Sequence, residues 1–325
     1  MVDNRIDTTA AAVGAFFCGS PPSRVLLESS TESEWVAQLL EACGHEVIVA
    51  DPNYTAMYAT RTRRIKTDRR DVAALADACR LGVYRPAHRV SRLQRRRRQH
   101  LRIRRQLIGV RTQLINLLRA TLRQEGVRLG RGSASTAAAR LARLSLADDV
   151  AAIVAPLGAI LVDLEPHVRA ADQSLAHEVA TDPRIDRLQT VPGVGPIVAL
   201  TFHATLDTPD RFGGDARRAT AFVGVVPSES SSGERHHKGR ITKNGPRELR
   251  ALMIQASWVV WRSRAAAAQT LRTWAHALAQ RRGRRIAIVG LARRLVRILF
   301  AVWRDGTTFA PRPWLGPTRC MAETT

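Results

Sequence analysis

An uninterrupted helical pattern between Ser91 and about Glu125 limits the possible folds of this 325-residue chain more than any other segment. This stretch has no proline and no strand signal, and its apolar residues recur at alternating steps of three and four: Ile103, Leu107, Val110, Leu114 and Leu117. Such spacing places apolar side chains along one helix face, in the manner of coiled coils. We therefore predict a long amphipathic helix that connects separate folded units, since the chain exceeds the usual length of one domain.

The residues before this helix have an α/β pattern. Residues 24–28 and 46–50 are short β-prone runs, and the helical spacing of residues 32–43 between them ends at Gly44. A further helix is predicted from Thr67 to Gly82. We expect an α/β domain over residues 1–88.

The residues after the long helix indicate mainly α structure. The small, polar segment Gly130–Thr136 is a predicted linker, and residues 137–180 return to helical spacing, which gives a basic helical connector over residues 89–180. Residues 181–325 form a predicted third domain. Its C-terminal part shows two helical patterns, Ala251–Ala279 and Ile286–Arg304.

Charge points to nucleic acid as the partner. The net charge is +23, and residues 61–128 hold 21 Lys and Arg against four acids. Such an excess attracts polyanions at long range. The run Arg95, Arg96, Arg97 and Arg98 repels itself, so we predict phosphate contacts there; a solvated helix face is the alternative. The chain has three lysines, Lys66, Lys238 and Lys243, which we interpret as places where a compact ammonium is needed.

Other classes of protein are disfavoured. The longest apolar run near the C-terminus, Ile286–Ala292, is too short for a bilayer span of about 20 residues, and the N-terminus lacks the charge pattern of a secretory signal. We expect no membrane partner and a cytoplasmic, nucleoid-associated protein. The four cysteines are scattered without metal spacing, which predicts small buried fillers rather than a zinc site or a disulfide framework.

Three carboxylates have spacing that suits a metal site: Glu28, Asp68 and Asp71. Asp68 and Asp71 are three residues apart, so both project from the first turn of the predicted helix. Glu28 ends a strand, where ligand-binding groups gather in α/β folds. Divalent cations prefer such oxygen ligands, and two ions can activate a water or hydroxyl against a phosphodiester. The alternative is ordinary capping, because acids in a first turn favour the helix dipole.

Two further segments could carry chemistry. The turn around Gly193 and Gly195 resembles a helix–hairpin–helix hairpin, whose backbone N–H groups contact a DNA phosphate; a plain helix–turn–helix corner is the alternative. Residues 227–245 combine serines with bases. A serine among Arg235, Lys238 and Lys243 could attack a phosphodiester, with the cations neutralising the developing charge. A flexible loop that grips phosphate is the competing interpretation.

Five segments resemble, in order, the transposases of the insertion sequence 110 family: "VLLES" with Glu28, "GHEVIVADPN", "KTDRRDVAALA", "VPGVGPIVA" and "SSGERHHKGRITKNG". The resemblance spans residues from about 24 to 304. It implies an α/β N-terminal RuvC-like (RNase H-like) domain with an Asp-Glu-Asp-Asp metal site, a long helical coiled-coil connector, and a C-terminal domain with a nucleophilic serine. The implied function is that of a DNA transposase or recombinase.

The resemblance also implies particular residues and partners. Glu28, Asp68 and Asp71 match the last three acids, with Mg²⁺ as the cofactor. The family's Ser-Ser-Gly aligns with Ser231, Ser232 and Gly233, so Ser231 is the first candidate nucleophile and Ser232 the second. The implied partners are DNA, a structured guide (bridge) RNA and further copies of the chain in a homo-oligomer, a dimer or tetramer.

The N-terminus departs from the family pattern. The family's first Asp ends an apolar strand well before the Glu strand, whereas Asp3 and Asp7 follow no apolar run, and only Val13–Cys18 resembles a remnant strand. We therefore expect an incomplete RuvC-like domain in a truncated, inactive chain. Two alternatives to the transposase stay open: a non-catalytic nucleic-acid-binding protein, and a metal-dependent junction nuclease without the serine step.

Overall fold

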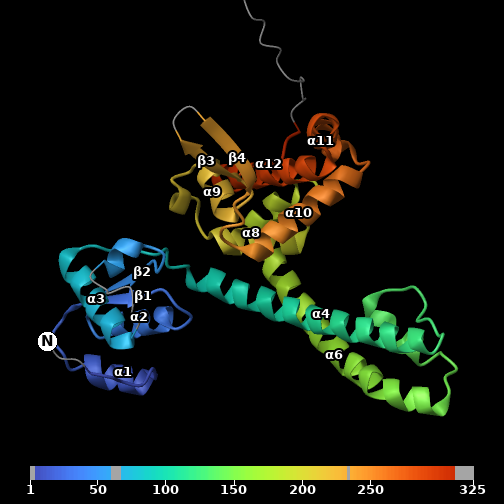
Figure 1. Cartoon of the computed structure of the whole chain (residues 1–325), viewed down its shortest axis with the longest axis horizontal. Helices are drawn as coiled ribbons and strands as arrows, with labels where there is room; N and C mark the ends of the chain where they lie inside the picture. The colour runs from blue at the N-terminus through green and yellow to red at the C-terminus, as the bar shows by residue number, and fades with distance from the viewer. Residues whose placement is uncertain (1–3, 60–66, 233–234, 312–325) are drawn as a thin grey trace, which may run out of the picture. The chain divides into compact units, whose positions relative to one another are not determined.

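The computed structural model describes residues 4–59, 67–232 and 235–311, and the side chains of residues 230–238 lie outside that description. The chain divides into two compact units, Met1–Val90 and Ser91–Thr325. Figure 1 shows the elements of both units, coloured from blue at the N-terminus to red at the C-terminus. Each unit is described by itself below.

The first unit contains the predicted strand–helix–strand motif. Strands β1 (Arg24–Glu28) and β2 (Glu46–Ala50) pair in parallel, and helix α2 (Ser33–Ala42) connects them. The short helix η1 (Thr55–Tyr58) and helix α3 (Asp68–Leu81) follow. The boundaries of α3 agree with the prediction: the Thr67 side chain accepts a hydrogen bond from the Arg70 amide at its start, and Gly82 ends it with φ 69°.

The segment Val13–Cys18 is not the remnant strand that the sequence analysis expects. Val13–Phe17 belong to helix α1 (Ala10–Phe17), which begins after Thr9, and Cys18 follows its last residue. The Thr9 hydroxyl accepts a hydrogen bond from the Ala12 amide, and the alanines of this segment favour a helix. Apolar residues here follow one another without the alternation of a half-buried strand, so the pattern allowed either structure.

The cysteines also differ from expectation. A disulfide joins Cys18 to Cys43, whose Cα atoms lie 4.7 Å apart. Each of these cysteines immediately follows a helix, and the packing of α1 on α2 brings the two helix ends together. Cys18 is exposed and Cys79 half-buried, so the prediction of buried, unbonded cysteines is wrong for the described residues. Cys320 lies outside them.

The second unit begins with the predicted long helix, α4 (Arg92–Gln124). Helix α6 (Asp148–Ala180) packs antiparallel to α4, as Figure 1 shows in green, and η2 (Ala134–Thr136) and α5 (Ala137–Leu141) lie between them in sequence. The buried apolar side chains of α4 are Leu101, Ile115, Leu118 and Leu122. The predicted apolar row therefore packs inside this unit only in part: Ile103, Val110 and Leu117 are exposed, whereas Leu107 and Leu114 are half-buried and Leu114 packs against the cluster around Ile115 and Leu118.

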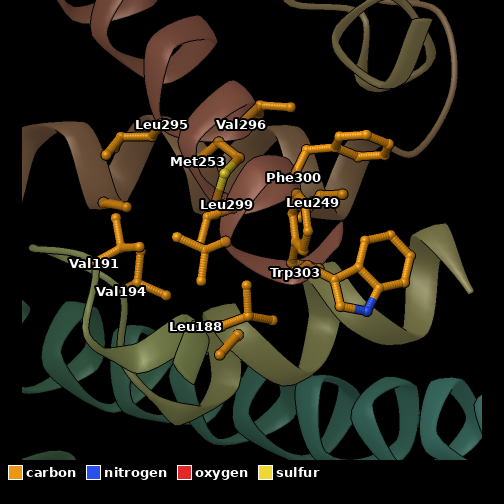
Figure 2. Packing of buried hydrophobic residues seen from close by; sticks show 14 of the residues in the cluster. Leu188, Val191, Val194, Leu249, Met253, Leu295, Val296, Leu299, Phe300 and Trp303 are labelled. Atoms are coloured by element: carbon orange, nitrogen blue, oxygen red, sulfur yellow. The ribbon is translucent and has the colours of Figure 1, made fainter. Parts of the chain in front are cut away.

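The remaining elements of the second unit form a mainly helical body, as predicted. Its elements are α7 (Pro183–Gln189), α8 (Pro196–Leu206), η3 (Pro209–Phe212), α9 (Ala216–Val223), β3 (Pro227–Ser232), β4 (Arg235–Ile241), α10 (Arg247–Arg262), η4 (Ala266–Ala268), α11 (Gln269–Arg282) and α12 (Arg284–Asp305). Helix α12 is the centre of this body. Figure 2 shows one cluster that contains Leu295, Leu299 and Trp303 of α12 together with Met253 of α10 and Leu188 of α7.

The predicted helix over Ala251–Ala279 is two helices in the structure. The chain leaves the helical region at Ser263, where ψ is 138°, and α11 begins six residues later. Side chains stabilise this break: the Ser263 hydroxyl accepts a hydrogen bond from the Ala265 amide, and Arg272 donates one to the Ser263 carbonyl. The predicted helix over Ile286–Arg304 is confirmed as α12, and Gly283, with φ 83°, separates it from α11.

Among the described residues, α6 is the one helix that is both long and apolar enough to cross a membrane. Length and composition alone are weak grounds for a membrane span, and α6 pairs with α4 through Glu165 and Asp172.

Candidate functional site

Glu28 lies at the C-terminal end of β1 and is exposed. Its carboxylate oxygen Oε2 accepts a hydrogen bond of 2.8 Å from the Tyr58 hydroxyl, so η1 holds this side chain at the strand end. Glu28 was predicted from the sequence, whereas Tyr58 was not. An aromatic residue in a loop after a strand gives no signal that it reaches back to the preceding strand.

The first turn of α3 carries Asp68 and Asp71, and packing sets its direction relative to β1. The Cys79 sulfur lies 3.9 Å from the Arg24 carbonyl oxygen, at the start of β1, and Leu75 shares a core cluster with Leu26. One helical turn covers roughly the same length as two strand residues, about 5–7 Å. Asp71, one turn before Leu75, is therefore directed toward the Glu28 end of β1.

The three carboxylates nevertheless do not form a metal site in this arrangement. Within residues 4–59, 67–232 and 235–311, no three His, Cys, Asp or Glu side chains lie close enough to hold an ion. Asp68 is exposed, and Asp71 is half-buried with interactions of its own. The carboxylate oxygens of these residues suit a hard divalent cation, but the three side chains do not lie close enough together to hold one.

A cavity of about 390 Å³ adjoins Glu28 in the first unit. Its lining includes three carboxylates, Asp7, Glu28 and Glu32, beside apolar residues such as Val13, Leu27 and Val36. Asp68 and Asp71 are not among the lining residues. Asp7 follows no apolar run and was therefore not predicted as a site residue, but the tertiary structure brings it to the same cavity as Glu28.

The run of four arginines at the start of α4 has mixed roles. Arg97 is buried, with ion pairs of 2.8 Å to Asp182 and 3.2 Å to Glu178. Arg98 donates hydrogen bonds to the Ala204 and Thr205 carbonyls near the end of α8. Arg97 and Arg98 therefore bind the second unit's own chain, which corrects the expectation of four arginines facing phosphate. Arg96 is exposed and Arg95 half-buried.

A buried polar cluster surrounds Arg97. The His203 Nδ1 atom lies 3.2 Å from the Arg97 guanidinium and 3.1 Å from the Gln94 amide nitrogen. Burial, with the charges of Arg184 and Arg97, lowers the pKa of His203 to about 4. Burial by itself would raise the pKa of Asp182, but hydrogen bonds from Arg184 and Arg97 outweigh it and hold that pKa well below its ordinary value. At neutral pH the cluster holds a neutral imidazole and ionised Asp182.

The glycine turn connects α7 to α8 as a helix–turn–helix corner. Gly193 has φ 80°, and a Cβ atom there would lie 2.7 Å from the Ala256 carbonyl oxygen of α10. Gly195 precedes α8 with φ −89°, and a Cβ atom there would meet nothing within 4 Å. Gly193 therefore has a packing role, whereas packing does not require glycine at Gly195.

The serine-rich segment forms a β-hairpin rather than a flexible loop. Strands β3 and β4 pair antiparallel, with Ser231 opposite His236 and Ser232 opposite Arg235. The side chains of Ser231, Ser232, Arg235 and Lys238 lie outside the described residues, as do Lys66 and Gly233 entirely. Lys243 is described: it is exposed and has φ 57°.

The base of this hairpin is fixed by close backbone contacts. Cβ atoms at Gly224 and Gly245 would overlap the carbonyl oxygens of Asn244 and Phe222 respectively. Arg250 of α10 donates hydrogen bonds to the Val223 and Asn244 carbonyls, 3.0 and 2.9 Å away. The sequence analysis missed these three residues, although a glycine on each side of a serine-rich segment is a turn signal. The contacts anchor both ends of the hairpin to the helical body.

Comparison with known proteins gives two family matches. Residues 7–126 match a profile named for DEDD transposases of the IS110 type and described as "Transposase". Residues 185–272 match the profile described as "Transposase IS116/IS110/IS902 family". The two matches cover the carboxylates of the first unit, the long helix α4, the glycine turn and the β3–β4 hairpin.

Individual relatives align along most of the chain. A protein of Pseudomonas aeruginosa described as a probable family 20 transposase is 30% identical over 313 residues, which are 93% of this chain and 90% of that protein. The transposase for insertion sequence element IS1328 of Yersinia enterocolitica is 25% identical, over 91% of this chain and 88% of that protein. The transposase for IS1111A of Coxiella burnetii is 29% identical, over 75% and 68% respectively.

Proposed function

We propose that this chain, which belongs to the IS116/IS110/IS902 family of transposases, cuts and rejoins DNA through a serine nucleophile on the β3–β4 hairpin. The observation that carries this proposal is the anchored base of the hairpin, where Gly224, Gly245 and Arg250 fix a segment rich in serine and basic residues. A nucleophile on a fixed hairpin approaches its target in a defined geometry, and such positioning lowers the barrier to reaction.

Ser231 is the proposed nucleophile. Its hydroxyl oxygen attacks the phosphorus of a DNA phosphodiester, a serine–phosphate bond forms, and the bond from phosphorus to one deoxyribose oxygen breaks. The serine proton leaves to solvent or a nearby base, and the departing deoxyribose oxygen takes up a proton. Attack by a second strand's deoxyribose hydroxyl on the serine phosphate then rejoins DNA and frees the serine. Arg235, Lys238 and Lys243 are the proposed cations that stabilise the developing charge.

The first unit would supply the carboxylates. A DEDD transposase domain suggests the use of divalent metal in general. We propose Glu28, Asp68 and Asp71 as ligands and Mg²⁺ as the ion, on the chemistry of their oxygen donors and the direction of α3 toward the Glu28 end of β1. Because the present arrangement does not hold an ion, calorimetric titration should show weak Mg²⁺ binding that Glu28→Gln weakens further. Tight binding unaffected by that change would reject these ligands.

DNA is the partner that a transposase implies, and a structured guide RNA is a further proposal. We propose three parts of the chain: residues 1–88 as the RuvC-like domain, residues 89–180 as a coiled-coil connector, and residues 181–325 as the serine-bearing domain. Within the last, the amides of Gly193 and Gly195, at the helix–hairpin–helix-like turn, are proposed phosphate contacts. Lys66, Arg95 and Arg96 are proposed to contact the backbone of the nucleic acid; Arg97 and Arg98 are internal.

The test is a search for a protein–DNA bond that survives denaturation. We expect an adduct with wild-type protein and DNA carrying the insertion-sequence ends, and none with Ser231→Ala. DNA affinity should stay nearly unchanged, because a hydroxyl contributes little beside so many arginines. Ser232→Ala is the matched control and should keep the adduct.

The other outcomes are informative. An adduct that persists in Ser231→Ala and vanishes in Ser232→Ala moves the nucleophile by one residue. Strand transfer with both serines replaced rejects covalent serine catalysis and favours the metal-dependent nuclease. DNA binding with neither adduct nor cleavage, also in the presence of candidate guide RNA, favours the non-catalytic binding protein.

A further inference from the structure

The C-terminal helices α10, α11 and α12 hold a second concentration of positive charge, separate from that of residues 61–128. From Leu249 to Arg304 the chain has 12 arginines and no Asp, Glu or Lys. Within residues 4–59, 67–232 and 235–311, one of these arginines pairs with a carboxylate, Arg304 with Asp305. The three helices pack on one another, as Figure 1 shows in orange and red, so this charge is gathered on one part of the second unit.

Four side chains from these three helices form a continuous patch, which we term the Trp258 patch: Arg284, Trp258, Trp261 and His276. The Arg284 guanidinium lies over the Trp258 ring, 5.7 Å from the ring centre. The Trp258 and Trp261 rings meet edge to face, with their centres 6.4 Å apart. The His276 ring stacks on Trp261, with 3.9 Å between the ring centres and 12° between the ring planes.

Packing of the hydrophobic core accounts for only part of this patch. Trp261 lies against the core cluster of the second unit, whereas Trp258 is not among the described residues that pack on that cluster. Trp258 is half-buried and His276 is exposed. A large aromatic ring that stays outside the core, beside an exposed ring and a guanidinium, is available to a planar partner.

Helix stability does not account for the arginines beside the patch. Helix α12 begins with Arg284 and Arg285, has no acid in its first turn, and has no side-chain cap at Gly283. Cations at this end of a helix oppose the helix dipole, which favours negative charge there. Both arginines are exposed. Their charge therefore suits an anionic partner better than it suits the helix itself.

We propose that the Trp258 patch binds unpaired bases of a DNA strand, and that the arginines around it contact the phosphates of that strand. The inference rests on the proposed function, because a strand that is cut and transferred leaves its duplex. Every base has a flat π face that stacks on aromatic rings, and proteins that bind single strands combine such rings with positive charge. Because His276 is exposed, a base can extend the stack that His276 forms with Trp261.

The chemistry of the patch disfavours duplex DNA as its occupant. Bases in a duplex stack on one another, so their flat faces do not reach protein rings, and the arginines alone would suffice for a duplex backbone. An RNA strand has the same flat bases and phosphates and differs by its 2′-hydroxyl groups. We assign DNA because DNA is the partner that a transposase implies.

The test separates bases from phosphates. Fluorescence anisotropy gives the Kd of the full-length protein for a labelled deoxythymidine strand of about 15 nucleotides, a length that spans one single-strand site. A strand of the same length without bases keeps the phosphates and removes the stacking partner. The matching deoxythymidine–deoxyadenosine duplex and a uridine RNA strand of equal length complete the set.

The variants alter the exposed part of the patch. Trp258→Ala removes the ring, and Trp258→Phe keeps an aromatic ring at the same position. Val259→Ala is the matched control, because Val259 is 50% exposed and lies about 100° around α10 from Trp258. Arg284→Gln removes charge next to the ring. Circular dichroism with thermal melting checks that every variant is folded.

We expect the wild type to bind the deoxythymidine strand at least ~10-fold more tightly than the strand without bases, since each stacked base adds affinity. Trp258→Ala should weaken binding of the deoxythymidine strand at least ~5-fold and leave the strand without bases within about twofold. Trp258→Phe should restore most of the loss, and Val259→Ala should change neither affinity by more than about twofold. Arg284→Gln should weaken both strands, because it removes a phosphate contact.

Three results would overturn the proposal: equal wild-type affinity for the strands with and without bases, equal effects of Trp258→Ala and Val259→Ala, or tighter binding of the duplex or the RNA strand than of the DNA strand. This binding requires no cutting, so its outcome is separate from that of the serine test. An adduct that persists in Ser231→Ala rejects that nucleophile and leaves the Trp258 patch as proposed.

Discussion

At the scale of single residues, the buried polar cluster of the second unit is formed by side chains that the sequence does not distinguish from their neighbours. Arg97 lies within a run of identical arginines, yet it is the one that is buried between Asp182 and Glu178. His203 is one of several scattered histidines, yet it lies against Gln94 and Arg97 in the buried cluster. Residue identity alone does not distinguish these positions from their neighbours; burial does.

The first prediction concerns pH. His203 has a folded pKa of about 4 against an ordinary value of 6.5, so the unfolded chain takes up its proton first as pH falls. The stabilisation is complete above about pH 6.5 and is lost progressively toward pH 4, by about 3 kcal/mol at most. Urea unfolding between pH 7 and pH 4 should show this fall, and His203→Gln should reduce it. An equal fall in both proteins would contradict the prediction. The contribution of Asp182 disappears only at still lower pH, because its folded pKa is depressed below that of the unfolded chain.

The second prediction compares two glycines of one turn. Gly193→Ala forces a side chain into a left-handed backbone position and against the Ala256 carbonyl, so we expect a loss of about 1–3 kcal/mol in unfolding free energy. Gly195→Ala meets open space at φ −89° and should change it by less than about 0.5 kcal/mol. Thermal denaturation of both variants provides the comparison. Equal effects would mean that the turn does not pack on α10 as described.

At the scale of elements, α4 combines three roles on different faces. One face packs on α6 with Leu118 and Leu122 in its core, a second is open and apolar, and the remainder carries most of the arginines. The ion pairs of Arg97, Arg104 and Arg111 occur at intervals of seven residues along the α6-facing side. Charged pairs inside a helix interface specify which partner row and register are used.

The third prediction separates two neighbouring arginines of this helix. Arg97→Gln leaves Asp182 and Glu178 without their buried partner, so we expect a loss of about 3–5 kcal/mol in unfolding free energy. Arg96→Gln changes an exposed side chain and should alter stability by less than about 0.5 kcal/mol while weakening nucleic-acid binding. Chemical denaturation and fluorescence anisotropy with labelled DNA measure the two properties. Destabilisation by Arg96→Gln of similar size would reverse the assigned roles.

At the scale of the whole molecule, the net charge is +23 because arginines greatly outnumber acids, and the internal ion pairs do not change this net charge. The carboxylates of α6 neutralise the α6-facing side of α4, and the exposed arginines elsewhere on that helix stay available. A transposase needs sequence-tolerant attraction to nucleic acid before any specific complex forms, and this distribution supplies it.

The fourth prediction is a steep dependence of DNA affinity on salt. The logarithm of the association constant should fall linearly with the logarithm of KCl concentration, by about 0.9 per phosphate neutralised. Replacing the exposed Arg96 and Arg102 by Gln should weaken binding across unrelated sequences and reduce the slope by about 1–2. A flat dependence, or a loss confined to one sequence, would show that phosphate contacts are not the main source of affinity.

At the candidate site, local sequence pattern predicted the ends of secondary-structure elements but not the contacts between distant segments of the chain. Thr67 and Gly82 predicted the ends of α3, because capping and left-handed termination are local properties of the backbone. Glu28 was predicted at the end of β1 because residues 24–28 form a short β-prone run, which is also a local pattern. The approach of Tyr58 to Glu28, and of Asp7 to the cavity beside it, depends on chain segments 20 or more residues apart, and no local spacing encodes such contacts.

The elements with strong periodicity, the concentration of positive charge and the family could all be predicted from the sequence, because hydrophobic spacing, capping residues and ordered motifs are local features of the chain. The packing of the folded chain was needed to establish which apolar residues of α4 are buried, which of four consecutive arginines are internal, and that Val13–Phe17 is helical. These choices depend on what packs opposite each residue. Ile103 and Leu101 are equally apolar in the sequence, and the packing of α6 and α8 against α4 leaves the first exposed and buries the second.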